Sequence, residues 1–299
     1  MAQAIISRKG GGGGGYATIT FDNVSSLTKT ITSTTFLGCD NSAATTVGDY
    51  ALFGGGSRYT SSGSSYRNGI LACNTSLTTS STTFLSVERA SLVATTVGDY
   101  ALFGGGYNGS HQSTVDAYNS SLTRSTPTAL SVARNGLAAT TVGDYALFGG
   151  GVGSSYSATV DAYNTSLTRS TPTALSVARY GLAATTVGDY ALFGGGYNDR
   201  SSAIVDVYNA SLTKSTTTDL SVANRYLAAT SVGNYALFGP TTRADIIDTY
   251  YLNNQVLVYP GTKYKLGSMT DEATSDSMQM ITTTAPITGY IKIKDATIN

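Results

Sequence analysis

Charged residues are scarce in this sequence, which also holds a single histidine, two cysteines and no tryptophan. Asp, Glu, Lys and Arg together make up 12% of the residues, about half of the ~25% that is usual for a soluble domain. The 18 basic and 18 acidic residues cancel to a formal net charge of zero. Without a basic field, the counterion release that drives nucleic-acid binding is missing. Nucleic acid is therefore not an expected partner.

The shortage of cysteine and histidine excludes several kinds of chemistry. Cys39 and Cys73 are too few for a disulfide framework or a cysteine-rich zinc site. His111 is the one histidine, so a histidine metal centre has a single candidate ligand. A Ser-His-Asp triad built on it would need oriented partners that the sequence pattern does not supply. We predict that His111 is an exposed loop residue and that the chain is not an enzyme and uses no metal or cofactor.

Long apolar runs are also missing. No stretch approaches the roughly 18 to 20 apolar residues that span a bilayer, and residues 1–9 contain no apolar segment of signal-peptide length. We therefore predict neither membrane insertion nor secretion through a signal peptide. Hydrophobic residues still reach 41%, enough for a sizeable core, so Ser, Thr, Asn, Gly and Tyr must cover most of the surface.

An internal repeat dominates the sequence. The string Ala-Thr-Thr-Val-Gly-Asp-Tyr-Ala-Leu-Phe-Gly-Gly-Gly occurs at 44–56, 94–106, 139–151 and 184–196, with a degenerate copy at 229–240. Its valines at 47, 97, 142, 187 and 232 are separated by 50, 45, 45 and 45 residues. Each of the three middle units adds a Val-Asp-x-Tyr-Asn string, beginning at Val115, Val160 and Val205. Self-similarity at such a period indicates a repeat architecture.

Each repeat reads as four strands. In one unit, 182–187 and 190–193 are β-prone runs joined by Gly188-Asp189, a two-residue hairpin signal. A third strand is predicted at 204–208, and Asn209 begins the turn into a Thr-rich fourth strand. No segment shows helical periodicity with caps over ten or more residues. The fold class is therefore predicted to be all-β.

These residues resemble the kelch repeat family. The match rests on Val187-Gly188-Asp189-Tyr190, on Phe193-Gly194-Gly195 and on Asp206-Val207-Tyr208, and it covers residues 40–257. The resemblance implies a β-propeller, with one four-stranded blade for each repeat. Five hairpins imply five blades, and a sixth, degenerate blade is the alternative. The chain departs from the family because it lacks the fourth-strand tryptophan.

The repeat divides the chain into three parts. Residues 1–15 form a leader that ends in six glycines, which is typical of a flexible joint. Residues 16–257 form the propeller, with the repeats at 39–257 and ring-closing strands at 16–38, because 21–37 resembles the outer half of a later blade. Closure would remove exposed sheet edges. Residues 258–299 are predicted to form a small C-terminal β appendage.

Carboxylates and arginines recur with the repeat. Aspartates stand in the hairpin turns and before the third-strand tyrosines, at 49, 99, 144 and 189 and at 116, 161 and 206. Rings of carboxylates could bind calcium, but turn aspartates more often cap their own backbone, and we favour that interpretation. Arg89, Arg134 and Arg179 each precede a repeat valine by eight residues. We expect them to bond carbonyls or carboxylates of adjacent blades.

The repeats differ from one another at one set of positions. The loops 57–69, 107–113, 152–157, 197–202 and 241–244 vary, as do the starts of the first strands at 40, 90, 135, 180 and 225. In a four-stranded blade both sets emerge on the same face, which is rich in Tyr, Ser, Asn and Gly, a composition typical of adaptable binding surfaces. The alternative is that nothing constrains these loops. The predicted binding residues are Tyr59, Tyr66, Tyr107, Tyr156, Tyr180, Tyr197 and Arg225.

The overall character is similar to that of virion proteins of phages and prophages. This resemblance rests on the kelch-like repeats, the leader Ser7-Arg8-Lys9 followed by glycines, and the lack of charge. It implies a non-enzymatic tail-associated, fibre or capsid-decoration protein in a symmetric assembly. The two ends would contact other virion proteins. The propeller would expose a face that binds host-surface glycan or protein. The alternative is a cytoplasmic bacterial kelch scaffold or sugar-processing propeller.

Overall fold

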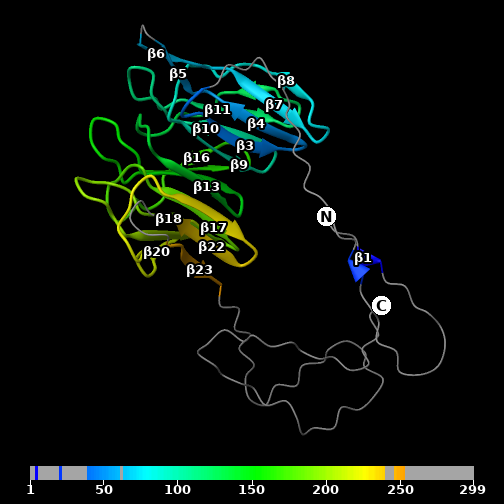
Figure 1. Cartoon of the computed structure of the whole chain (residues 1–299). Coiled ribbons are helices and arrows are strands. Elements are labelled where there is room, and N and C mark those ends of the chain that lie inside the picture. Colours follow the sequence, from blue (N-terminus) through cyan, green and yellow to red (C-terminus); the bar gives the residue numbers. More distant parts are fainter. Residues whose placement is uncertain (1–3, 6–19, 22–38, 61–62, 240–245, 253–299) are drawn as a thin grey trace, which may run out of the picture. The chain divides into compact units, whose positions relative to one another are not determined.

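The computed structural model describes residues 4–5, 20–21, 39–60, 63–239 and 246–252 (Figure 1). Every regular element in these residues is a β-strand, and the described part contains no helix that could cross a membrane. The strands lie in one compact unit, Met1–Tyr251. The predicted all-β class is confirmed.

Five antiparallel sheets of three or four strands follow one another along the described part of the chain. The first holds β3 (Ala43–Val47), β4 (Tyr50–Gly54), β7 (Ile70–Asn74) and β8 (Thr79–Ser81). The second holds β9 (Val93–Val97), β10 (Tyr100–Gly104), β11 (Val115–Asn119) and β12 (Arg124–Ser125). The third holds β13 (Ala138–Val142), β14 (Tyr145–Gly149), β15 (Val160–Asn164) and β16 (Arg169–Ser170). The fourth holds β17 (Ala183–Val187), β18 (Tyr190–Gly194), β19 (Val205–Asn209) and β20 (Lys214–Thr216). The fifth holds β21 (Ala228–Val232), β22 (Tyr235–Gly239) and β23 (Asp248–Tyr251).

Local turn chemistry explains why each repeat forms the same sheet. Val187 pairs with Tyr190 across a two-residue turn in which Gly188 has φ 52°, as the Gly-Asp signal predicts. After the third strand, the Asn209 side-chain oxygen accepts hydrogen bonds from the backbone N–H groups of Ser211 and Thr213, at 3.0 and 2.9 Å. This side-chain bond shapes the turn into the short fourth strand.

Neighbouring sheets pack through a repeated contact between glycine and phenylalanine. A Cβ atom added to Gly104 would lie 2.7 Å from the Phe148 ring, and one added to Gly149 would lie 2.7 Å from the Phe193 ring. Any side chain there would overlap the ring, so only glycine fits. In each pair the phenylalanine belongs to the later sheet and reaches back to the earlier one. The interface between sheets therefore has a direction.

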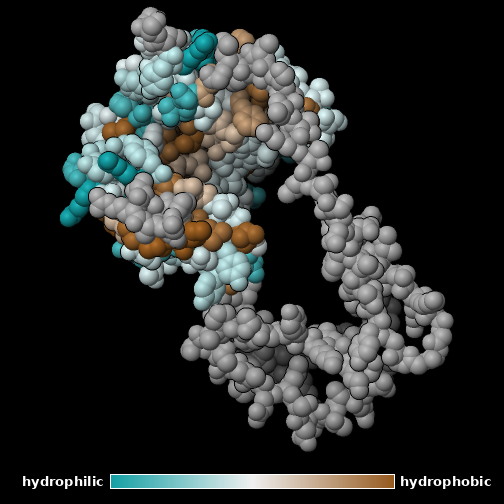
Figure 2. Space-filling view, in the orientation of Figure 1, coloured by the Kyte–Doolittle hydropathy of each residue, from teal (hydrophilic) through white to brown (hydrophobic). Residues whose placement is uncertain are grey.

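The two end sheets each leave one side without a described neighbour. Phe53 in the first sheet is 44% exposed, whereas Phe148 is 0% exposed. Val232 in the last sheet is 63% exposed, whereas Val142 is 1% exposed. Hydrophobic side chains gather along this last sheet in Figure 2, where Figure 1 places β22.

The segments predicted to close the ring fall mostly outside the described residues. Phe21 lies in β2 (Thr20–Phe21), which pairs with β1 (Ala4–Ile5), but residues 22–38 and the appendage at 258–299 are not among those described. The number of blades and ring closure stay predictions. The last sheet already contains its own third strand, β23, so the N-terminal segment could supply only its fourth.

One variable loop is more regular than we expected. Residues 57–69, interpreted as a loop, contain a second hairpin, β5 (Ser57–Thr60) with β6 (Gly63–Tyr66), in which Ser57 pairs with Tyr66. The longer spacing of 50 residues after the first repeat valine accommodates this insertion. The hairpin adds a projecting ribbon to the variable edge of the first sheet.

Candidate functional site

The variable loops and the first-strand starts lie on the same edge of the sheets, as predicted. Isolated β-bridges join the first residue of each described loop to the start of a first strand: Asp40 with Ser57, Ala90 with Tyr107, Asn135 with Val152, and Tyr180 with Tyr197. We call this edge the loop face. The loop at 241–244, the partner expected for Arg225, lies outside the described residues. Four repeats therefore show the same juxtaposition.

The loop face gathers four tyrosines and one arginine, which we call the tyrosine cluster: Tyr156, Tyr180, Tyr197, Arg225 and Tyr226. Tyr156 stacks on Tyr180 with ring centroids 5.7 Å apart and an interplanar angle of 9°. Tyr197 and Tyr226 meet Tyr180 edge-on, at 5.8 and 5.9 Å. Such aromatic pairs are each worth about 0.5–1.5 kcal/mol beyond area burial. The cluster is thus a preorganised surface.

Hydrogen bonds hold two of the phenol groups. The Tyr156 hydroxyl donates to the Asp199 carboxylate at 3.2 Å. Partial burial raises the pKa of Tyr156, and the hydrogen bond to Asp199 raises it further. Partial burial also raises the pKa of Tyr226, together with a hydrogen bond to Tyr180. Both phenols therefore stay protonated and neutral at physiological pH.

The guanidinium of Arg225 lies over the Tyr197 ring, 4.2 Å from its centroid, and 5.9 Å from the centroid of Tyr226. Arg225 itself is exposed. No carboxylate among the described residues forms an ion pair with it. The charge is positioned by aromatic rings rather than by an acidic partner.

The other predicted binding residues lie apart from this cluster. Tyr66 meets Tyr107 edge-on at 6.1 Å, and Tyr107 meets His111 at 5.4 Å. His111 is half-buried, with its Nδ1 inaccessible to solvent, so the prediction of an exposed histidine was wrong; the Tyr107 ring covers it. Tyr59 is 68% exposed and contacts no other described aromatic ring. Six of the seven predicted residues thus fall into two groups.

Sequence reasoning missed Tyr226. Tyr226 comes directly after the variable first-strand start at Arg225. At the position equivalent to Tyr226 the other repeats have Asn41, Ser91, Gly136 and Gly181. All five have positive φ, and Tyr226 has φ 53°, which is strained for a bulky residue. Its backbone N–H donates to the Gly181 carbonyl at 2.7 Å, and its ring covers Gly181. The sequence did contain a signal for Tyr226, because two of the other repeats have glycine at the position that tyrosine occupies here.

The repeated carboxylates have a structural role. Asp161 is 0% exposed, and its Oδ2 accepts from Arg134 Nη2 at 2.8 Å; Asp116 with Arg89 and Asp206 with Arg179 repeat this pair. The expected arginine contacts are confirmed. These aspartates lie within strands and bind arginines, whereas the capping role expected of the hairpin-turn aspartates stays a prediction. The described residues hold no group of three potential metal ligands.

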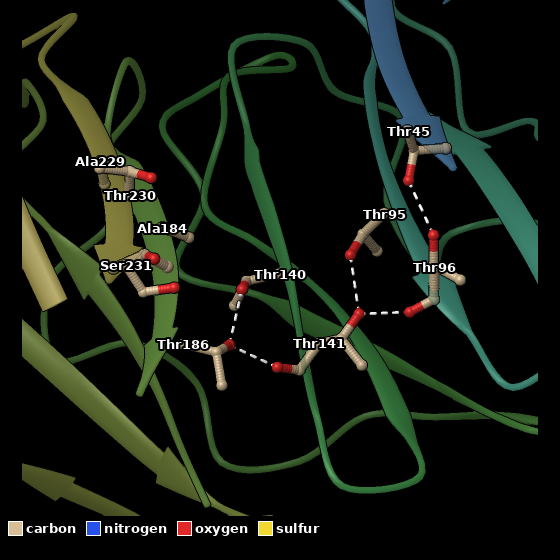
Figure 3. A pocket seen from close by; sticks show the side chains of 11 residues that line it. Thr45, Thr95, Thr96, Thr140, Thr141, Ala184, Thr186, Ala229, Thr230 and Ser231 are labelled. Atoms are coloured by element: carbon tan, nitrogen blue, oxygen red, sulfur yellow. Dashed lines mark hydrogen bonds between the residues drawn. The ribbon is translucent and has the colours of Figure 1, made fainter. Parts of the chain in front are cut away.

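The first strands of the sheets line an open cavity of about 400 Å³. Figure 3 shows its threonines, including Thr95, Thr96, Thr141 and Thr186. The Thr141 hydroxyl donates to the Thr96 carbonyl, and because a hydroxyl has one proton, Thr95 must donate to Thr141 across 2.8 Å. Thr186 and Thr140 repeat the arrangement. These bonds tie adjacent sheets together, and the lining carries no formal charge.

Cys39 and Cys73 stand where later repeats have arginine and tyrosine, and no disulfide joins them. Leu71 similarly stands opposite Phe53, where Asp116 stands opposite Phe103 in the next sheet. The first sheet has therefore lost both members of the arginine–aspartate pair.

No protein-family model matches the chain, and no curated protein matches it. A solved structure shares the fold. The structure of YjhT aligns with a TM-score of 0.59 over 73% of this chain and 82% of that chain, at 13% sequence identity. A likeness at this identity concerns the fold alone. Together with the repeated four-stranded sheets, it is consistent with a β-propeller.

Proposed function

We propose that this chain is a non-enzymatic phage virion protein, tail-associated, in a fibre or decorating the capsid, whose loop face binds host-surface glycan or protein. The observation that carries the proposal is the tyrosine cluster on the one edge where the repeats differ. The glycine–phenylalanine contacts, by contrast, recur from sheet to sheet, and the buried arginine–aspartate pair recurs in the three middle repeats. Variation is therefore concentrated where the aromatic side chains gather.

Tyrosine suits a binding role for physical reasons. It offers a large, rigid contact area with a polar tip at low conformational-entropy cost. In this cluster Tyr156, Tyr180 and Tyr197 are all half-buried, so part of each ring is already ordered by its neighbours. Binding would then require little further ordering, which favours affinity.

The chemistry of the loop face supports binding rather than turnover. His111 packs against Tyr107 with its Nδ1 buried, which is a poor position for a general base. In the tyrosine cluster the neighbouring carboxylate, Asp199, is engaged by a phenol. Nothing in this arrangement resembles a nucleophile held by a base.

We further propose that the five sheets are kelch-like blades of one closed ring, completed by residues 16–38. The regular 45-residue period and the packing of consecutive first strands support this. Residues 1–15 and 258–299 would then be available for contacts with other virion proteins in a symmetric assembly. A mass-spectrometric census of purified particles tests the location: the virion proposal expects this chain at fixed stoichiometry, and a cytoplasmic scaffold or sugar-processing propeller would be absent.

The binding proposal is tested with Tyr107, Tyr156 and Tyr197 replaced together by Ala. We expect attachment to host cells to be lost while the protein stays folded. The three rings are only partly buried, so losing their mutual contacts should lower the melting temperature without unfolding the sheets. The matched control is Tyr190→Ala with Tyr235→Ala, two residues that are 42% and 49% exposed beside the hairpin turns. It should attach like the wild type. Equal attachment by the triple variant would remove the loop face from the proposal.

A further inference from the structure

Arg225 presents a guanidinium whose edge makes no contact with the described residues. The guanidinium lies over Tyr197 at 4.2 Å, and a guanidinium that uses its face in this way keeps its N–H donors at the edge. Among residues 39–60, 63–239 and 246–252 no oxygen accepts a hydrogen bond or ion pair from Arg225. No described residue therefore uses these donors.

The arginines buried between the sheets behave differently. Arg134, for example, is 0% exposed and donates to Asp161, to the Phe148 carbonyl and to the Val132 carbonyl. Arg225 stands instead at the variable start of a first strand, where the other repeats have Asp40, Ala90, Asn135 and Tyr180. Its position in the repeat is one of variation, and it takes no part in the contacts that hold the sheets together.

Tyr226 provides a flat surface beside that guanidinium. It is 69% exposed, with its centroid 5.9 Å from Arg225 Cζ. Its ring is held against Gly181, where an added Cβ would lie 3.0 Å from Cε1, and it meets Tyr180 edge-on. A bulky residue at φ 53° persists only where its surroundings hold it. The strain therefore places an aromatic ring next to a cation.

We propose that Arg225 and Tyr226, supported by Tyr197 and Tyr180, form a subsite for a sugar residue that carries an oxyanion, either a carboxylate or a phosphate. The sugar ring would stack on Tyr226, and the oxyanion would accept from the edge of the Arg225 guanidinium, the geometry in which arginine binds carboxylate and phosphate best. This inference rests on the proposed glycan-binding role of the loop face.

The adjoining loop carries one charge of each sign, so the unpaired positive charge of the tyrosine cluster is that of Arg225. Asp199 is the acidic residue of the adjoining loop, and its carboxylate accepts from the Tyr156 hydroxyl. Arg200, beside it, is exposed, and its positive charge offsets that of Asp199. A saccharide is favoured over a peptide because the subsite offers an exposed ring beside a cation.

Calorimetric titration of the full chain with three probes tests the proposal: a uronate-containing oligosaccharide, a glycerol-phosphate oligomer that carries sugar, and a neutral oligosaccharide of equal length. We expect at least one anionic probe to bind at least tenfold more tightly than the neutral one, and the preference to shrink as salt is raised. Arg225→Gln should weaken that probe by about 10- to 100-fold, as expected for a charged hydrogen bond. Arg225→Lys should restore only part, because an ammonium is a point charge.

Tyr226→Gly separates binding from folding. Glycine occupies this position in two other repeats and tolerates the positive φ, so the melting temperature should hold or rise while binding of the anionic probe falls at least tenfold. The matched control is Arg58→Ala, an exposed arginine in β5 with no ring beneath it among the described residues; its affinity should stay within twofold of the wild type.

The outcomes distinguish this inference from the proposed function. Binding of the uronate probe alone, or of the phosphate probe alone, supports the subsite and identifies the oxyanion. Equal binding of neutral and anionic probes, or Arg225→Gln binding like the wild type, overturns the inference; host attachment lost in the triple tyrosine variant would still support the loop face. An acidic peptide that binds in an Arg225-dependent way, with no saccharide binding, also overturns it.

Discussion

Removing one member of a buried arginine–aspartate pair should destabilise the protein more than removing both. Asp161 and Arg134 are each 0% exposed and 2.8 Å apart. Asp161→Leu would leave the Arg134 guanidinium buried without its carboxylate. Loss of one partner of such a pair is destabilising by about 3–5 kcal/mol. For a domain of this size, 1 kcal/mol shifts the melting temperature by about 2–4 °C, so the expected drop is about 6–20 °C.

The double variant Arg134→Met with Asp161→Leu should recover most of that loss. Apolar replacements of a buried pair are often neutral or stabilising, and the chain contains its own precedent. In the first sheet Cys39 and Leu71 stand at the two equivalent positions. Both members of the pair have changed together there, which is the combination that the energetics favour.

Thermal melting and urea titration of the wild type, both single variants and the double variant measure this coupling. Arg134→Met should be milder than Asp161→Leu, because Asp161 still accepts from the Ser131 N–H at 3.1 Å and from Arg169 at 3.4 Å. If Asp161→Leu melts within about 2 °C of the wild type, or if the double variant is no more stable than Asp161→Leu, the pair does not couple as argued.

Four further predictions follow from the packing, the charges and the repeat. Gly149→Ala should destabilise by about 1–3 kcal/mol, because its Cβ would lie 2.7 Å from Phe193; an unchanged urea midpoint would contradict this packing. Burial acts to raise the pKa of Asp206, but hydrogen bonds from Ser176 and Arg179 outweigh it and the pKa is lowered, so its contribution is present above pH about 4 and lost as pH falls through the lowered pKa. The melting temperature of Asp206→Asn should therefore fall less steeply between pH 5 and pH 2 than the wild type, and parallel curves would refute this. Deleting residues 1–38 should cause aggregation or a large loss of stability if they close the ring; melting like the full chain would exclude that role. His111→Ala should leave attachment unchanged, and sugar or ester turnover that this variant abolished would show an enzyme.

Features governed by local sequence could be predicted, and contacts between repeats could be predicted only in part. The Gly188-Asp189 turn and the flanking alternation determine pairing within a few residues, so the predicted strands agree with β17 and β18 to within one residue. The roles of Asp116, Asp161 and Asp206 depend on arginines 27 residues away. The sequence pattern predicted that the arginines bond carbonyls or carboxylates, but it did not indicate which aspartates accept from them.

For the binding surface, too, the sequence predicted the location but not the contacts between different repeats. Repeat variation located the loop face, because the constant positions are those that neighbouring sheets require. It did not reveal that Arg225 lies over Tyr197, or that Tyr226 completes the cluster, since these contacts join different loops. The β5–β6 hairpin was missed because its short strands, Ser-Arg-Tyr-Thr and Gly-Ser-Ser-Tyr, contain too few apolar residues to show an alternation of apolar and polar positions.

The direction of the sheet interface has a consequence for how such a chain changes over generations. Each 45-residue unit contains both a phenylalanine that reaches back and a glycine that receives the next ring, as Gly149 receives Phe193. A unit that is duplicated or lost in whole therefore brings two compatible surfaces together at the new junction. A substitution on one side of the interface alone leaves two surfaces that no longer fit, and this favours copies with the same residues at the interface. Gene-level gain or loss of whole units is thus the change that this architecture accommodates most readily, while the loop face stays open to independent variation.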